Sequence, residues 1–249
     1  MKKGDYARHA ALWDLGGPDR SGEITFYSTL AGRYGEKVLS LMCATGEIAR
    51  GMAEDGLRVT AIDREPAMIA EAKKVAPGSD NPLFLTGDVT TLDLPEKDYD
   101  FAFIGTGNLH HLETEKEIQD TLTNIQRHLR KKGGLALELL YPAAESWHSP
   151  EQRYDPPNPP DSGVKTWKLS ESRYDADTMC QHIRQEVFIE EDGLIDSFIH
   201  ELDLRLLNEE TIFRLLGQAG FRIIAEYGGF DFREWQPGTG KWIVESVKL

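Results

Sequence analysis

Two aspartates stand where short apolar segments of the chain end, and their carboxylates could bind a ligand. Asp63 ends residues 59–62, an apolar run that predicts a buried strand, and Asp88 follows a similar run at residues 82–85. An acidic side chain at the end of a strand in a parallel sheet can accept hydrogen bonds from ribose hydroxyls of a ligand lying across that edge. Asp63 therefore predicts that the ligand is a nucleoside.

Two adjacent histidines, His110 and His111, follow another apolar segment at residues 99–104. The loop before them contains two glycines and Asn108, whose side-chain amide offers both a donor and an acceptor. Imidazole titrates near neutral pH, so either histidine could take a proton from a hydroxyl or ammonium group. A histidine that only holds the loop is the alternative. Adjacent side chains diverge and no ligand set is completed nearby, so we expect no metal here.

The elements that must position these groups follow an alternating pattern. Residues 38–42 predict a buried strand, the small residues 43–46 a tight turn, and residues 48–53 a helix. Pro66 then opens a helix after the second strand. The later pattern predicts a helix at 113–130 ended by Gly133-Gly134, strands at 135–140, 222–227 and 241–247, and a helix at 209–218 with Asn208 as its N-cap.

A different pattern occupies the middle of the chain. Residues 141–161 contain six prolines and predict a loop. Partial alternation then predicts antiparallel strands at 165–169, 181–189 and 195–204, with a hairpin turn at residues 191–193. We expect this inserted sheet to cover an active site or to make a homodimer contact. Candidate residues for lining the site are Trp147, Tyr154, Trp167, Tyr174 and Arg184.

The ordered segments resemble the motifs of class I S-adenosylmethionine-dependent methyltransferases. The resemblance rests on residues 38–46, 59–63, 68–72, 86–89, 99–101 and 219–221, and it covers about 200 residues in the family's order. It implies an α/β fold with a Rossmann-like seven-stranded sheet flanked by helices and a small antiparallel insertion as a lid. The implied domains are an N-terminal helical lid segment (1–36), the cofactor-binding domain (37–144 and 208–249) and the insertion (145–207).

The resemblance also implies a cofactor site for S-adenosylmethionine. In the family, the acid at Asp88 meets the adenine amino group, and the backbone amide of Val89 meets a ring nitrogen. Tyr27 matches a position where an aromatic ring closes over the cofactor, with core packing as the alternative. The implied cofactor-binding residues are Tyr27, Ser40, Met42, Ala44, Gly46, Asp63, Arg64, Met68, Asp88, Val89, Gly105 and Thr106, and the candidate catalytic residues are Asn108, His110 and His111.

The first loop departs from the family's pattern. Ser40, Met42 and Ala44 stand where the family usually has an acid and two glycines, and Gly46 keeps the third. Met42 and Ala44 must therefore follow the same backbone path or narrow the pocket. The prediction is a methyltransferase acting on nitrogen or oxygen of a small acceptor; a non-catalytic or repurposed binding protein is the alternative. A nicotinamide-dependent oxidoreductase fits less well, because the first loop lacks its glycine fingerprint.

Composition limits the partners. The formal net charge of −14 over 249 residues argues against binding a nucleic-acid backbone and favours small molecules or proteins. Cys43 and Cys180 give no disulfide framework and no metal-site spacing, and we expect reduced thiols. No apolar run is long enough to span a bilayer, and no apolar core for a signal peptide follows Met1, so we expect a cytoplasmic protein with no membrane partner.

Overall fold

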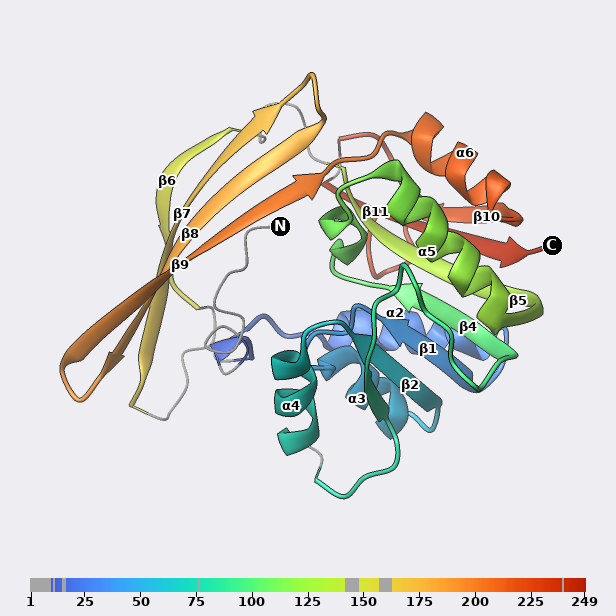
Figure 1. The fold of residues 1–249 in the computed structure, drawn as a ribbon, viewed down its shortest axis with the longest axis horizontal. Helices are drawn as coiled ribbons and strands as arrows, with labels where there is room; N and C mark the ends of the chain where they lie inside the picture. Colours follow the sequence, from blue (N-terminus) through green and yellow to red (C-terminus); the bar gives the residue numbers. More distant parts are fainter. Residues whose placement is uncertain are drawn as a thin grey trace.

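The computed structural model describes residues 10, 12–14, 17–75, 77–141, 148–156, 163–238 and 240–249, which form two separate sheets (Figure 1). The larger sheet contains β1 (Lys37–Leu41), β2 (Arg58–Asp63), β3 (Leu83–Thr86), β4 (Tyr99–Ile104), β5 (Leu129–Tyr141), β10 (Phe221–Tyr227) and β11 (Gly240–Lys248). Its helices are α2 (Ser21–Gly32), α3 (Glu47–Glu54), α4 (Pro66–Val75), α5 (Glu115–His128) and α6 (Glu209–Gln218), with a short 3-10 helix, η1 (Asn108–His111).

The larger sheet is mostly parallel. Its strand order is β10-β11-β5-β4-β1-β2-β3, and only β11 runs antiparallel to its two neighbours. Two apolar clusters cover the two faces: one takes side chains from α5 and α6, and the other takes side chains from α2, α3 and α4. Because both faces are covered, the central strands are buried on both sides and read as continuous apolar runs in the sequence. The predicted fold class is confirmed.

Local sequence explains how the helices begin. The Thr114 hydroxyl accepts from the Glu117 backbone N–H, and the Glu117 carboxylate accepts from Thr114, so a capping box starts α5. Asn208 Oδ1 accepts from the Thr211 N–H at 2.9 Å and caps α6 as predicted. Each helix then turns its apolar face to the sheet. None of the described helices is long and apolar enough to span a membrane.

The second sheet is antiparallel, in the order β6-β7-β8-β9, and its strands fall between β5 and α6 in the chain. They are β6 (Ser149–Tyr154), β7 (Lys165–Asp175), β8 (Cys180–Glu191) and β9 (Leu194–Arg205). Asp192 (φ 52°) and Gly193 (φ 77°) form the predicted turn between β8 and β9. The prediction of a loop throughout residues 141–161 was wrong for β6, which pairs with β7 along the sheet edge where proline is tolerated.

The end of α5 also differs from prediction. Gly133 and Gly134 do not end the helix; β5 already begins at Leu129 and contains both. A Cβ on Gly134 would lie 2.4 Å from the ring of Tyr34, and one on Gly133 would lie 3.0 to 3.2 Å from backbone carbonyl oxygens. These glycines therefore allow close packing within the strand. In the sequence, a glycine pair needed for packing cannot be distinguished from one that ends a helix.

Candidate functional site

A cavity of about 670 Å³ lies between the loops that follow the parallel strands and the inner face of the second sheet. From the larger sheet and its loops, its walls include Met42, Ala44, Asp63, Arg64, Glu65, Met68, Asp88, Val89, Asn108 and His111. From the second sheet they include Tyr154, Asp155, Thr166, Trp167, Lys168, Gln185, Val187, His200 and Leu202. Ligands of open α/β sheets bind at this edge, beyond the C-terminal ends of the strands. The cavity has the size of a typical small-molecule site.

The loop after β1 follows a left-handed path without its usual glycines. Met42 (φ 54°) and Ala44 (φ 50°) both have positive φ, as does Gly46 (φ 77°), which precedes α3. Such angles are uncommon for residues with a Cβ and carry strain. At Gly46 there is in addition no room for a side chain, since a Cβ there would lie 2.3 Å from the ring of Phe84. Met42 and Ala44 therefore keep the path, and their side chains line the cavity.

Asp63 fixes this loop from the end of β2. Its Oδ2 accepts the Ala44 N–H at 2.8 Å, and its Oδ1 accepts the Glu65 N–H at 3.0 Å. Burial raises the pKa of the Asp63 carboxyl, although these backbone hydrogen bonds act in the opposite direction. The same carboxylate faces the cavity, so it both shapes the loop and presents an acceptor to a ligand.

Asp88 also lines the cavity, and it has a local role. Its Oδ1 accepts from the Thr90 N–H at 2.8 Å and from the Thr90 hydroxyl at 2.7 Å. This is a turn interaction typical of aspartate. Val89, next to it, is buried and contributes to the apolar part of the wall. The turn interaction that the structure shows is compatible with the site role predicted for Asp88.

The two adjacent histidines have different surroundings. His110 is fully buried; its Nδ1–H donates to the Arg205 carbonyl at 2.6 Å, and its Nε2 accepts the Leu140 N–H at 2.8 Å. His111 lines the cavity instead. Burial lowers the pKa of each imidazole to about 4, and for His111 the nearby Arg64 lowers it further. Both ring nitrogens of His110 thus bond to backbone groups, which favours the alternative that this histidine only holds the loop.

The buried state of His110 makes stability depend on pH. Between pH 6.5, the ordinary histidine pKa, and about 4, the unfolded chain binds a proton that the folded chain does not. The free energy of unfolding therefore falls as the pH falls through this interval. In His110→Gln we expect the slope to be smaller by about 1.4 kcal/mol per pH unit. Urea unfolding at several pH values measures it; equal slopes for variant and wild type would contradict the assignment.

Several residues implied by the resemblance lie outside the main cavity. Tyr27 is fully buried, stacks on Phe103 with ring centroids 4.5 Å apart, and donates to Glu138 Oε2 at 3.2 Å. This position agrees with the core-packing alternative, and closure of Tyr27 over the cofactor stays a prediction. Ser40, Gly105 and Thr106 line a separate cavity of about 40 Å³ behind the first loop. Gly46 lines neither cavity.

Asn108 supports the first loop as well as lining the cavity. Its side-chain amide donates to the Met42 carbonyl at 2.8 Å, which joins the loop after β4 to the loop after β1. This contact orients the Asn108 amide group and accounts for one of its donors. Asn108 therefore helps to fix the position of Met42, which also lines the cavity.

Sequence reasoning missed several cavity residues. Arg20 lines both cavities and pairs with Glu23 at 2.7 Å and Glu47 at 3.2 Å. On the second sheet, Lys168, Gln185 and His200 were also missed. Of the residues expected to line the site, Tyr154 and Trp167 do so, Tyr174 and Arg184 do not, and Trp147 lies outside the described residues.

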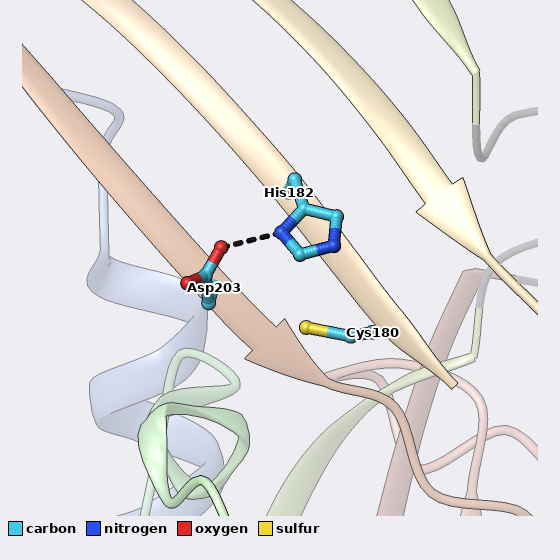
Figure 2. A group of neighbouring side chains, drawn as sticks. All are labelled: Cys180, His182 and Asp203. Atoms are coloured by element: carbon cyan, nitrogen blue, oxygen red, sulfur yellow. Dashed lines mark hydrogen bonds and ion pairs between the residues drawn. The ribbon is translucent and has the colours of Figure 1, made fainter. Parts of the chain in front are cut away.

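The structure brings together a group that cysteine spacing did not indicate. Cys180 and His182 on β8 and Asp203 on β9 place potential metal-ligand atoms within 4.8 Å of one another (Figure 2). His182 Nδ1 contacts Asp203 Oδ1 at 2.6 Å. Gln185 on β8 and its cross-strand partner His200 on β9 face the cavity. Because successive side chains of a strand point to opposite faces, Cys180, His182 and Asp203 lie on the outer face of the sheet. The absence of a metal site stays a prediction.

Comparisons with known proteins agree on one family. Residues 38–133 match the family model described as a methyltransferase domain. The chain is 30% identical over 103 residues to the putative methyltransferase YqeM of Bacillus subtilis, covering 41% of this chain and 42% of that protein. It is 28% identical over 119 residues to the demethylmenaquinone methyltransferase of Paenarthrobacter aurescens, covering 47% and 44%. The matches thus span less than half the length of these relatives.

Solved structures extend the similarity to nearly the whole chain. An S-adenosylmethionine-dependent methyltransferase from Clostridium acetobutylicum superposes with a TM-score of 0.82 at 15% identity, covering 98% of both chains. The sugar N-methyltransferase KedS8 from a Streptoalloteichus species gives 0.77 at 18% identity, covering 100% of this chain and 94% of that one. The resemblance predicted from the ordered motifs is confirmed. Residues 38–133 therefore match a methyltransferase domain, and nearly the whole chain has the fold of these solved S-adenosylmethionine-dependent methyltransferases.

Proposed function

We propose that the chain binds S-adenosylmethionine and transfers its methyl group to nitrogen or oxygen of a small molecule. The observation that carries this proposal is the single cavity that joins Asp63 and Asp88 to the inner face of the second sheet. A transfer enzyme needs a donor and an acceptor side by side without water between them. Two of the similar structures are described as an amino pentose methyltransferase and a sugar N-methyltransferase, which supports a small polar acceptor.

The cofactor would lie along the edge of the larger sheet. Asp63 would accept from the ribose hydroxyls, and Asp88 from the adenine amino group, with Val89 beside the ring. Arg20 lines both cavities beside the first loop, and its guanidinium, which pairs with Glu23 and Glu47, would lie near the carboxylate of the methionine part. Arg64 and Met68 complete the wall between these positions.

When bound, S-adenosylmethionine supplies a methyl group already activated by its sulfonium. The protein must therefore orient the acceptor lone pair and exclude water. Of the two adjacent histidines, His111 faces the cavity, and with a pKa of about 4 it is neutral near pH 7. A base so weak is poorly matched to removing a proton fully, because effective general bases have a pKa near the working pH. Its role is to accept a hydrogen bond and orient the acceptor.

We expect His111→Ala to lower kcat/KM for the acceptor about 30-fold while leaving affinity for S-adenosylhomocysteine within about twofold of the wild type. The loss reflects an oriented hydrogen bond to the acceptor. His111→Gln keeps an acceptor atom and should recover part of the rate. A weakened affinity for S-adenosylhomocysteine with unchanged kcat would contradict this role and place His111 against the cofactor.

The test of the function as a whole is product formation. Purified protein is incubated with S-adenosylmethionine and a panel of small amines, amino sugars and hydroxyl compounds, and released S-adenosylhomocysteine is measured. We expect turnover with at least one class of acceptor and none without an acceptor. Binding of S-adenosylmethionine without turnover across the panel would instead favour the non-catalytic binding protein.

A further inference from the structure

Lys168 on β7 is a cation in the cavity wall. It is half-buried, and within the part of the chain that the structure describes no carboxylate pairs with it. Its contact there is the face of Tyr154, with Nζ 5.9 Å from the ring centroid. Burial lowers the pKa of the Lys168 ammonium. Lysines removed from water are normally paired, because desolvating a charge without compensation is costly.

The carboxylates that share the cavity are engaged with other groups. Asp155 accepts from Arg153 Nε at 3.0 Å and Nη2 at 2.8 Å. Asp63 accepts backbone N–H groups, and Asp88 accepts from Thr90. Glu65 lies 3.6 Å from the guanidinium of Arg64. None of these acids is therefore placed to neutralise Lys168.

The surroundings of Lys168 offer further polar groups at the same wall. Cross-strand register aligns Ser170 on β7, Gln185 on β8 and His200 on β9 in one row, directly beside Lys168. Gln185 Nε2 lies 3.5 Å from Ser170 Oγ. His200 is almost fully buried, and Lys168 acts electrostatically on it. This row is polar although Val187 and Leu202 beside it are apolar, so one part of the wall is chemically distinct.

The neighbouring basic groups continue across the cavity. His111 is influenced electrostatically by His200 and by Arg64, and His200 by Lys168. Burial lowers the pKa of His111 and of His200, so these imidazoles offer hydrogen bonds, and Lys168 supplies the positive charge on the side of the second sheet. A charge in a cavity with low-dielectric walls attracts ligands of the opposite sign. Arg20 lies beside the first loop, where it pairs with Glu23 and Glu47.

We propose that the methyl acceptor carries an anionic group, a carboxylate or a phosphate, and that Lys168 binds it together with Gln185 and His200 on the second sheet. This inference rests on the proposed function, because it assigns the acceptor to the side of the cavity away from the cofactor. A charge-assisted hydrogen bond from Lys168 holds the acceptor by a group remote from the reacting atom, which orients that atom toward the donor. Lys168 is accordingly a specificity residue for acceptor charge.

The test uses the full chain saturated with S-adenosylhomocysteine. Inorganic phosphate and acetate are titrated at constant ionic strength, and tryptophan fluorescence reports binding. The variants are Lys168→Met, Lys168→Arg and Lys165→Met. Lys165 is the matched control because it lies on the same strand and loses the same charge, but its Nζ pairs with Glu190 at 3.1 Å on the exposed side. Saturation with S-adenosylhomocysteine is first verified for each protein by calorimetry.

We expect the wild type and Lys165→Met to bind one of the anions in the millimolar range, Lys168→Met to bind it about tenfold more weakly, and Lys168→Arg to stay within about threefold. The anion with the larger loss identifies the group as phosphate or carboxylate. Equal affinity in Lys168→Met and Lys165→Met would overturn the inference, as would failure of the wild type to bind either anion. Failure to bind S-adenosylhomocysteine at the calorimetry step would count separately, against the proposed function.

Discussion

Replacing Asp63 with alanine is expected to weaken binding of S-adenosylhomocysteine by about 100-fold, or about 2.7 kcal/mol. The side chain has two roles that alanine removes together. It would accept hydrogen bonds from the ribose, and it holds the Ala44 N–H at 2.8 Å and the Glu65 N–H at 3.0 Å. The second role is essential because Met42 and Ala44 follow a left-handed path that is strained without glycine. Calorimetric titration measures the change.

Two further variants test this expectation. Asp63→Asn keeps one acceptor oxygen and should fall between wild type and alanine. Asp93→Ala removes the same charge from an exposed site, where Asp93 pairs with Lys97 at 2.6 Å, and should leave affinity unchanged. If Asp63→Ala binds S-adenosylhomocysteine as tightly as Asp93→Ala does, the cofactor does not lie across the end of β2, and the site must be placed elsewhere.

The larger sheet was predictable because its signals are local. Buried parallel strands read as short apolar runs, and the cap at Asn208 indicates the start of its helix by residue type. The errors occurred where one residue type serves two purposes. Gly133 and Gly134 were interpreted as a helix stop, but they permit close packing against Tyr34 and the neighbouring backbone. The proline-rich stretch was interpreted as loop, but β6 is an edge strand.

The candidate site was partly predictable for the same reason. Asp63, Asp88 and the first loop follow strand ends directly, and they line the cavity. The wall formed by the second sheet was not predictable, because which face of a strand meets the cavity depends on tertiary packing. A shift of one residue exchanges the two faces, so Gln185 and Val187 face inward while Arg184 does not. Aromatic residues were therefore favoured as lining groups, and Lys168, which also lines the cavity, was missed.

Tyr27 and the Cys180 group show that residue type and spacing alone do not identify a side chain's neighbours. Tyr27 has the residue type expected near a cofactor, yet Phe103 and Glu138 hold it in the core. Cys180 has no metal-like spacing in the chain, yet a neighbouring strand brings Asp203 close to it and to His182. In both cases the deciding partner is distant in sequence. Residue type alone could not indicate which neighbour would be present.

Glu138 is the buried charge on which the loop after β4 depends. It is 3% exposed on β5, and its Oε2 accepts the Thr106 N–H at 2.7 Å and the Tyr27 hydroxyl at 3.2 Å. Its Oε1 pairs with the Lys241 ammonium, whose side chain is 32% exposed. One carboxylate thus joins α2, β11 and the start of the loop that carries Asn108 and His111.

We expect Glu138→Leu to lower the free energy of unfolding by about 3 kcal/mol, because breaking a buried pair leaves the remaining charge and donors unsatisfied. Glu138→Gln keeps an acceptor oxygen and should cost roughly half as much. Asp120→Ala, which breaks the exposed pair with Lys116, is the control and should cost less than about 0.5 kcal/mol. Urea unfolding measures all three.

The double variant Glu138→Leu with Lys241→Met tests which lost contact causes most of the destabilisation. The candidates are the ion pair with Lys241 and the hydrogen bond to the Thr106 N–H. Removing both charges takes away the uncompensated ammonium, so the double variant should be more stable than the sum of the single variants predicts. It still leaves the Thr106 N–H without its acceptor. We therefore expect stability to recover in the double variant while affinity for S-adenosylhomocysteine stays reduced. Additive losses of stability with normal affinity would mean that Glu138 neither compensates Lys241 nor shapes the cofactor loop.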